Sequence, residues 1–207
     1  MVAEFVRVQN LVLTWPAALA WIQWDVGLIA DARVSIAKFG CEEIRTLIRQ
    51  TGGGIGVAAL AEVTAEIGDH ASRVFLHSLL RPIRNRCATA GYGVLYFGAF
   101  SRYSGLLAAS LGLFKEAIDD LEQAVSDEAS RQAPVWKAYA EIDLARALHQ
   151  SGASRERVAS ALSAAHSSSN EVSSPRLARR LRTESERLQK CPVRDMNRPG
   201  NPGDSFS

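Results

Sequence analysis

The stretch GLLAASLGLFKEAIDDLEQAV, residues 105–125, indicates the fold of this chain. A small residue, Gly105, stands seven positions before a second glycine, Gly112. An apolar stripe at helical spacing follows, and it consists of Ala117, Ile118, Leu121, Ala124 and Val125. Because glycine readily adopts the left-handed conformation that ends a helix, the pattern predicts two antiparallel helices joined at Gly112.

The same pattern of a small residue, a seven-residue step and a glycine occurs three more times. The pairs are Ala20 with Gly27, Ala61 with Gly68, and Ala145 with Gly152. Successive glycines are 41, 44 and 40 residues apart, a period typical of helical repeats. We therefore expect an all-α fold in which antiparallel hairpins stack as an α-solenoid. The expected hairpins span residues 14–40, 55–82, 97–127 and 134–168.

Segments of different character flank the repeats. Residues 174–190 place leucines on one side and charges on the other, which predicts a terminal capping helix with a polar outer face. Residues 191–207 contain three prolines and two glycines, and we expect a disordered tail there. Residues 1–13 form an N-terminal extension, so the repeat domain is expected over residues 14–190.

Composition and charge narrow the classes of function. The chain has 207 residues, 47% of them hydrophobic, and a net charge of +2, while residues 1–170 alone sum to −1. Such a body lacks the basic stripe that direct nucleic-acid binding requires. The three cysteines are far apart and form no CxxC pair, which favours a reducing compartment, so we expect a cytoplasmic protein.

The apolar stretch at residues 11–30 could be mistaken for a membrane or signal segment. Pro16, Gln23 and Asp25 interrupt it, and the first ten residues carry Glu4 against Arg7 rather than a basic region. We therefore expect an apolar first repeat and no membrane association. The chain itself also begins with apolar residues, including Phe5, Leu11 and Trp15, so we expect an N-terminal association edge through which it forms homo-oligomers.

Four stretches together resemble a known family of repeats. They are WPAALAWIQWDVGLIADARVSIAKF, LAEVTAEIGDHASRVFLHSLLRP, RYSGLLAASLGLFKEAIDDLEQAV and VWKAYAEIDLARALHQSGASRERVASAL. They are similar to the tetratricopeptide-like (TPR-like) C-terminal region of bacterial signalling ATPases related to adenylate cyclases and LuxR-type regulators. The resemblance implies a non-enzymatic scaffold for protein–protein interaction in bacterial signalling or transcriptional regulation. The chain has no GxxxxGK[ST] loop, cyclase domain or C-terminal helix-turn-helix, so the family's output activities are not carried over.

The resemblance also implies a binding groove, lined by the first helix of each hairpin. The matching positions are Glu62, Glu66, Arg102, Tyr139, Arg146, His149 and Gln150. An aromatic ring beside fork-shaped cations suits a protein or peptide partner that carries carboxylates. The alternative is that Tyr139 and Arg146 lie on a solvated helix face together with Glu141 and Asp143.

Two other functions remain as alternatives. Residues 51–59, TGGGIGVAA, resemble the glycine-rich loop of short-chain dehydrogenases and would make the chain a small NAD(P)-dependent oxidoreductase. That mechanism needs a buried strand before the loop, but the preceding EIRTLIRQ carries charges throughout, so we favour a hinge between helices. The third possibility is a subunit of a transcription regulator whose DNA-binding part is another chain.

Catalytic and metal signatures are absent from the sequence. The four histidines never pair four residues apart, and no GxSxG motif occurs. We expect no catalytic residues, no cofactor and no metal site.

Overall fold

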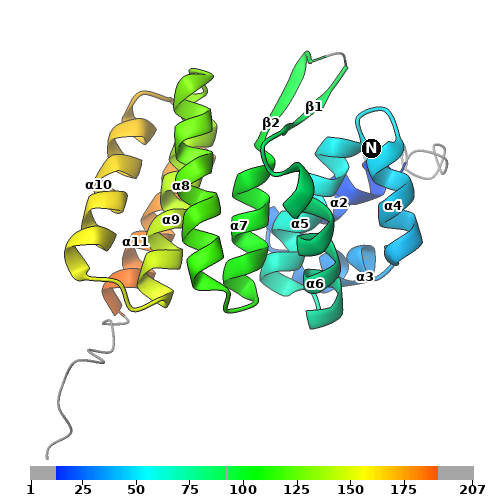
Figure 1. Cartoon of the computed structure of the whole chain (residues 1–207), viewed down its shortest axis with the longest axis horizontal. Helices are drawn as coiled ribbons and strands as arrows, with labels where there is room; N and C mark the ends of the chain where they lie inside the picture. The colour runs from blue at the N-terminus through cyan, green and yellow to red at the C-terminus, as the bar shows by residue number, and fades with distance from the viewer. Residues whose placement is uncertain (1–12, 92, 191–207) are drawn as a thin grey trace, which may run out of the picture.

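A computed structural model describes residues 13–91 and 93–190, which form a mostly helical protein (Figure 1). The N-terminal elements are α2 (Thr14–Asp25), α3 (Ile29–Ile36), α4 (Cys41–Arg49), α5 (Gly53–Ile67), α6 (His70–Leu80) and the 3-10 turn η1 (Arg81–Ile83). A two-stranded sheet of β1 (Cys87–Ala90) and β2 (Leu95–Ala99) follows. The C-terminal elements are α7 (Phe100–Ser110), α8 (Phe114–Ser130), α9 (Pro134–Gln150), α10 (Arg155–Asn170) and α11 (Pro175–Lys190). Along the long axis of the molecule α4 lies at one end and α10 at the other, and α11 lies behind, between α10 and α8 (Figure 1).

Small residues lie where the sequence predicted close helix packing. Ala61, Ala117 and Ala145 are fully buried, which confirms their assignment to the contacts between helices. At Gly105 a Cβ atom would come within 2.7 Å of the Leu121 side chain and 3.1 Å of the Ala117 carbonyl oxygen. Helices α7 and α8 can therefore approach closely because this position has no side chain.

Three of the four repeat glycines adopt the predicted conformation. Gly27, Gly112 and Gly152 have φ angles of 86°, 77° and 75°, in the left-handed region that ends helices. The same prediction is wrong for Gly68, which is extended with φ of −75°. A Cβ there would lie 2.7 Å from the carbonyl oxygen of Thr64, so Gly68 is required for space and not for its backbone angle.

The glycine-rich segment is a tight turn and a helix start, and it is preceded by a helix that the sequence analysis did not predict. Helix α4 ends at Arg49, Gly52 turns the chain with φ of 76°, and α5 begins at once. A Cβ on Gly53 would lie 1.7 Å from the carbonyl oxygen of Leu47, so α5 starts in direct contact with α4. The buried strand that dinucleotide binding needs before such a loop is replaced here by α4.

The expectation of an all-α fold was wrong for the segment between the second and third hairpins. Here β1 and β2 pair antiparallel, with Cys87 opposite Ala99 and Ala90 opposite Leu95. Gly91 and Gly93, with φ of 59° and 89°, lie in the connection. The third helical hairpin consequently begins at Phe100 rather than at residue 97.

Aromatic and polar contacts hold β2 against the helices. The Phe97 ring lies 4.9 Å from that of Trp136, measured between centroids. Glu128 of α8 accepts hydrogen bonds from the Ala99 backbone N–H and the Tyr96 hydroxyl, both at 2.6 Å. The strand is therefore anchored at the amino end of α7.

The terminal helix α11 packs as predicted through its leucines. Leu177 and Leu181 are buried against Ala138 and Ile142 of α9, and Leu188 is buried in a neighbouring cluster. The expected tail, residues 191–207, and residues 1–12 of the extension lie outside the described residues. Within residues 13–91 and 93–190, every helix is too short or too polar to cross a bilayer.

Candidate functional site

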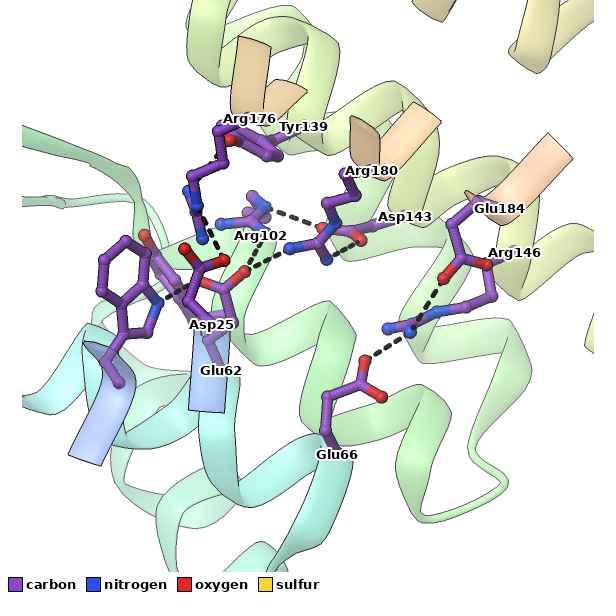
Figure 2. A network of polar contacts seen from close by, with 12 residues as sticks. Asp25, Glu62, Glu66, Arg102, Tyr139, Asp143, Arg146, Arg176, Arg180 and Glu184 are labelled. Atoms are coloured by element: carbon purple, nitrogen blue, oxygen red, sulfur yellow. Dashed lines mark hydrogen bonds and ion pairs between the residues drawn. The ribbon is translucent and has the colours of Figure 1, made fainter. Parts of the chain in front are cut away.

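Four charged side chains from four different helices form one closed ring of ion pairs, shown in Figure 2. We call Glu62 of α5, Arg102 of α7, Asp143 of α9 and Arg180 of α11 the charge ring. Arg102 contacts Glu62 at 2.9 Å and Asp143 at 2.7 Å. Arg180 contacts the same two carboxylates at 2.6 Å and 2.8 Å. Each carboxylate thus binds both guanidinium groups, so the ring joins α11 to α5, α7 and α9.

The charge ring lies in the interior, and its charges compensate one another. The Arg102 side chain is 0% exposed, and Glu62 and Asp143 are 2% exposed each. Burial alone would raise the pKa of Glu62 and Asp143, but the neighbouring arginines outweigh it and lower both pKa values. Burial would also lower the pKa of Arg102, yet Glu62 and Asp143 raise it. All three groups are therefore charged at neutral pH.

Tyrosine rings flank the buried guanidinium of Arg102. Its central carbon lies 5.1 Å from the ring centroid of Tyr103 and 5.2 Å from that of Tyr139. Within the described residues, the Arg102 Nη1 atom has no hydrogen-bond acceptor. The tyrosine rings provide cation–π contacts to a guanidinium whose hydrogen-bonding capacity is not fully used.

The charge ring extends to the first described helix, α2. The Trp21 indole N–H donates to Glu62 at 2.9 Å. Arg176 of α11 pairs with Asp25 at 2.9 Å and donates to the Tyr139 hydroxyl at 2.9 Å. Helix α11 therefore contacts both α2 and α9, although Asp25 and Arg176 are 151 residues apart in the sequence.

A second cluster repeats this arrangement further along α11. Arg146 of α9 pairs with Glu66 of α5 and lies 3.9 Å from Glu184 of α11 (Figure 2). Glu184 also contacts Arg187 at 3.2 Å. The same three helices, α5, α9 and α11, are thus linked a second time.

The structure brings together five of the seven predicted groove residues. Those five are Glu62, Glu66, Arg102, Tyr139 and Arg146. In the described part of the chain, His149 and Gln150 make no hydrogen bond or ion pair with the charge ring. Glu141 and Asp143 are buried beside Tyr139, so the alternative of a solvated face is wrong for these positions.

The predicted association edge is described only in part. Trp15 lies in α2 and is 41% exposed. Phe5 and Leu11 lie outside the described residues.

Sequence reasoning missed the side chains that complete the site, namely Asp25, Asp143, Arg176 and Arg180. A signal for two of them was present. Members of the charge ring follow one another at separations of 40, 41 and 37 residues, close to the spacing of the repeat glycines. A search for charges of alternating sign at the repeat period would have identified the ring.

The chemistry of the charge ring suits binding better than proton transfer. A general acid or base works best with a pKa near the working pH, whereas the ring carboxylates have lowered pKa values. Among the described residues, no group of three or more His, Cys, Asp or Glu could hold a metal ion. The arrangement holds one helix against three others through charge and aromatic contacts.

Comparisons with known proteins add no family to this description. No protein-family model, curated protein or solved structure matches the chain.

Proposed function

We propose that this chain is a non-enzymatic helical-repeat scaffold that binds a protein partner through the face formed by α5, α7 and α9. One observation carries the proposal: these three helices direct charged and aromatic side chains at a single helix, α11. A face that holds one amphipathic helix has the chemistry to hold another. Binding of a helix in a groove is a recurring mode of peptide recognition.

The character of the face supports a macromolecular partner over a small metabolite. Its contacts run along α11 from Arg176 to Glu184, a length of about two helical turns. The cavity beside it, between α2 and α11, has a volume of about 250 Å³ and includes Trp24 and Thr183 in its lining. Small-molecule sites are usually larger and mostly apolar. A row of contacts of alternating charge along two helical turns instead suits a helix of a partner protein.

The biological setting follows from the family resemblance. The scaffold acts in bacterial signalling or transcriptional regulation, and a partner chain supplies any DNA-binding part. We place it in the cytoplasm, where exposed Cys41 and half-buried Cys87 would remain reduced.

Site-specific photo-cross-linking in the source cells tests this function. A photoreactive amino acid at Trp24, on the rim of the face, should yield a discrete cross-linked protein. The same amino acid at Asp119, exposed on α8, is the matched control and should not. Cross-links that form from Asp119 and not from Trp24 would place the interaction elsewhere and refute the proposed face.

A further inference from the structure

Helix α11 is held from one side only. Leu177, Leu181 and Leu188 are buried, whereas Arg179 and Arg182 on its other side are exposed. The four residues 171–174 connect it to α10. Because α11 is the last described helix of the chain, its departure would leave the chain path through α2 to α10 unchanged.

Departure of α11 would leave an acidic surface. Asp25, Glu62 and Asp143 belong to α2, α5 and α9, and among the described residues Arg102 would be the one cation left in an ion pair with them, because nearby Arg146 pairs with Glu66. Three carboxylates beside one guanidinium carry a net charge of −2. Such a surface attracts a cationic ligand.

The same surface favours arginine over lysine. The Arg176 guanidinium carbon lies 4.2 Å from the ring centroid of Trp21 and 5.3 Å from that of Tyr139. It also donates through two different nitrogens, to Asp25 and to the Tyr139 hydroxyl. A planar fork that stacks and donates together is a property of guanidinium, and an ammonium group cannot reproduce it.

Spacing along α11 defines the pattern that this surface accepts. Arg176, Arg180 and Glu184 follow at four-residue intervals, so they share one side of the helix. Leu177 and Leu181 each come one position later and are buried against α9. The surface thus receives arginine–leucine pairs four residues apart.

We propose that the surface formed by Asp25, Glu62, Asp143, Trp21 and Tyr139 binds an arginine-bearing amphipathic helix of a partner protein, and that α11 occupies this surface in the free chain. The inference rests on the proposed function and specifies its partner. Sequence alone favoured a peptide with carboxylates. Because Arg102 and Arg146 are already paired with carboxylates inside the chain, we replace that expectation with a cationic helix.

The test uses the full chain and a fluorescent peptide of residues 174–190, SPRLARRLRTESERLQK, measured by fluorescence anisotropy. Arg180→Glu in the chain weakens the internal competitor and leaves the carboxylates of α2, α5 and α9 unchanged. Arg182→Glu makes the same charge change on the exposed side and is the control. Apparent affinity scales with the fraction of open chains, so Arg180→Glu should bind the peptide about tenfold more tightly than wild type or Arg182→Glu.

A second variant separates the release of α11 from the change of charge, and a second peptide tests the preference for arginine. Leu181→Ala loosens α11 without changing charge, and it should also tighten peptide binding. A peptide with Arg176→Lys and Arg180→Lys should bind Leu181→Ala about tenfold more weakly than the arginine peptide. Circular dichroism establishes that each variant keeps its helices.

Each outcome decides the proposal. Equal affinities for the variants with Arg180→Glu and Arg182→Glu would show that α11 does not compete, and equal binding of both peptides would overturn recognition of arginine. Light scattering on the same samples should give the same oligomeric state for the wild type and for Arg180→Glu. A wild-type dimer that Arg180→Glu abolishes would make a second copy the occupant and overturn the proposal of a separate partner. If the peptide binds none of the variants while the photoreactive amino acid at Trp24 still cross-links a protein, the proposed function stands and the proposal of an arginine-bearing partner helix is wrong.

Discussion

Replacing Arg102 by methionine removes the cation at the centre of the charge ring and keeps a side chain of similar length. Glu62 and Asp143 would then share only Arg180. Loss of one partner of a buried ion pair costs about 3–5 kcal/mol, because the other charge stays buried without compensation. Arg102 is 0% exposed, so solvent screening does not reduce this estimate. For a chain of this size the loss corresponds to a fall in Tm of about 6–20 °C.

Thermal unfolding followed by circular dichroism measures the effect, with Arg157→Met as the matched control. Arg157 pairs with Glu122 at 2.9 Å, but the two side chains are 56% and 52% exposed. Exposed pairs contribute less than about 1 kcal/mol, so the control should unfold almost as wild type. If both variants lose the same stability, the charge ring is not the stabilising element that we describe.

Three further predictions concern packing, pH and association. Ala117→Trp should destabilise the contact between α7 and α8 by about 1–3 kcal/mol or more, and an unchanged Tm would contradict the helix register. Because the pKa values of Glu62 and Asp143 are lowered from 4.5 and 3.8, their stabilisation is present above those values and is lost as pH falls below them. The Tm of the wild type should therefore drop below about pH 4.5, and that of Glu62→Gln, already lower at neutral pH, should drop less. Trp15→Ser should weaken self-association in sedimentation experiments, and a wild type that is strictly monomeric at high concentration would contradict the predicted edge.

The helical hairpins were predictable because their signals are local. Gly112 and Gly152 end helices by adopting backbone angles that other residues avoid, and small residues mark close contacts. Helix α4 was not predicted because it is short and carries charges throughout, although Ile44, Leu47 and Ile48 follow a helical spacing. The strand Cys87–Ala90 has only four residues and no clear alternation, so its sequence gives little indication of a strand.

The candidate site was predictable only in part, because it depends on how the helices meet in space. The resemblance selected Glu62, Arg102 and Tyr139 as residues of one face, and they do lie together. It could not reveal that α11 covers that face, since the pairing of Asp25 with Arg176 spans nearly the whole described chain. For the same reason the sequence predicts a polar outer face for α11 and does not show that Arg176 and Arg180 pair with other helices.

The central claim is that α11 occupies a surface made for a partner helix, and a distance measurement tests it most directly. The three native cysteines are first changed to serine. Nitroxide labels are then attached at two exposed positions, Arg182→Cys on α11 and Val34→Cys on α3. Double electron–electron resonance on the free chain should give one narrow distance distribution, and saturating peptide of residues 174–190 should add a population at longer distance. A distribution that the bound peptide leaves unchanged would contradict the account.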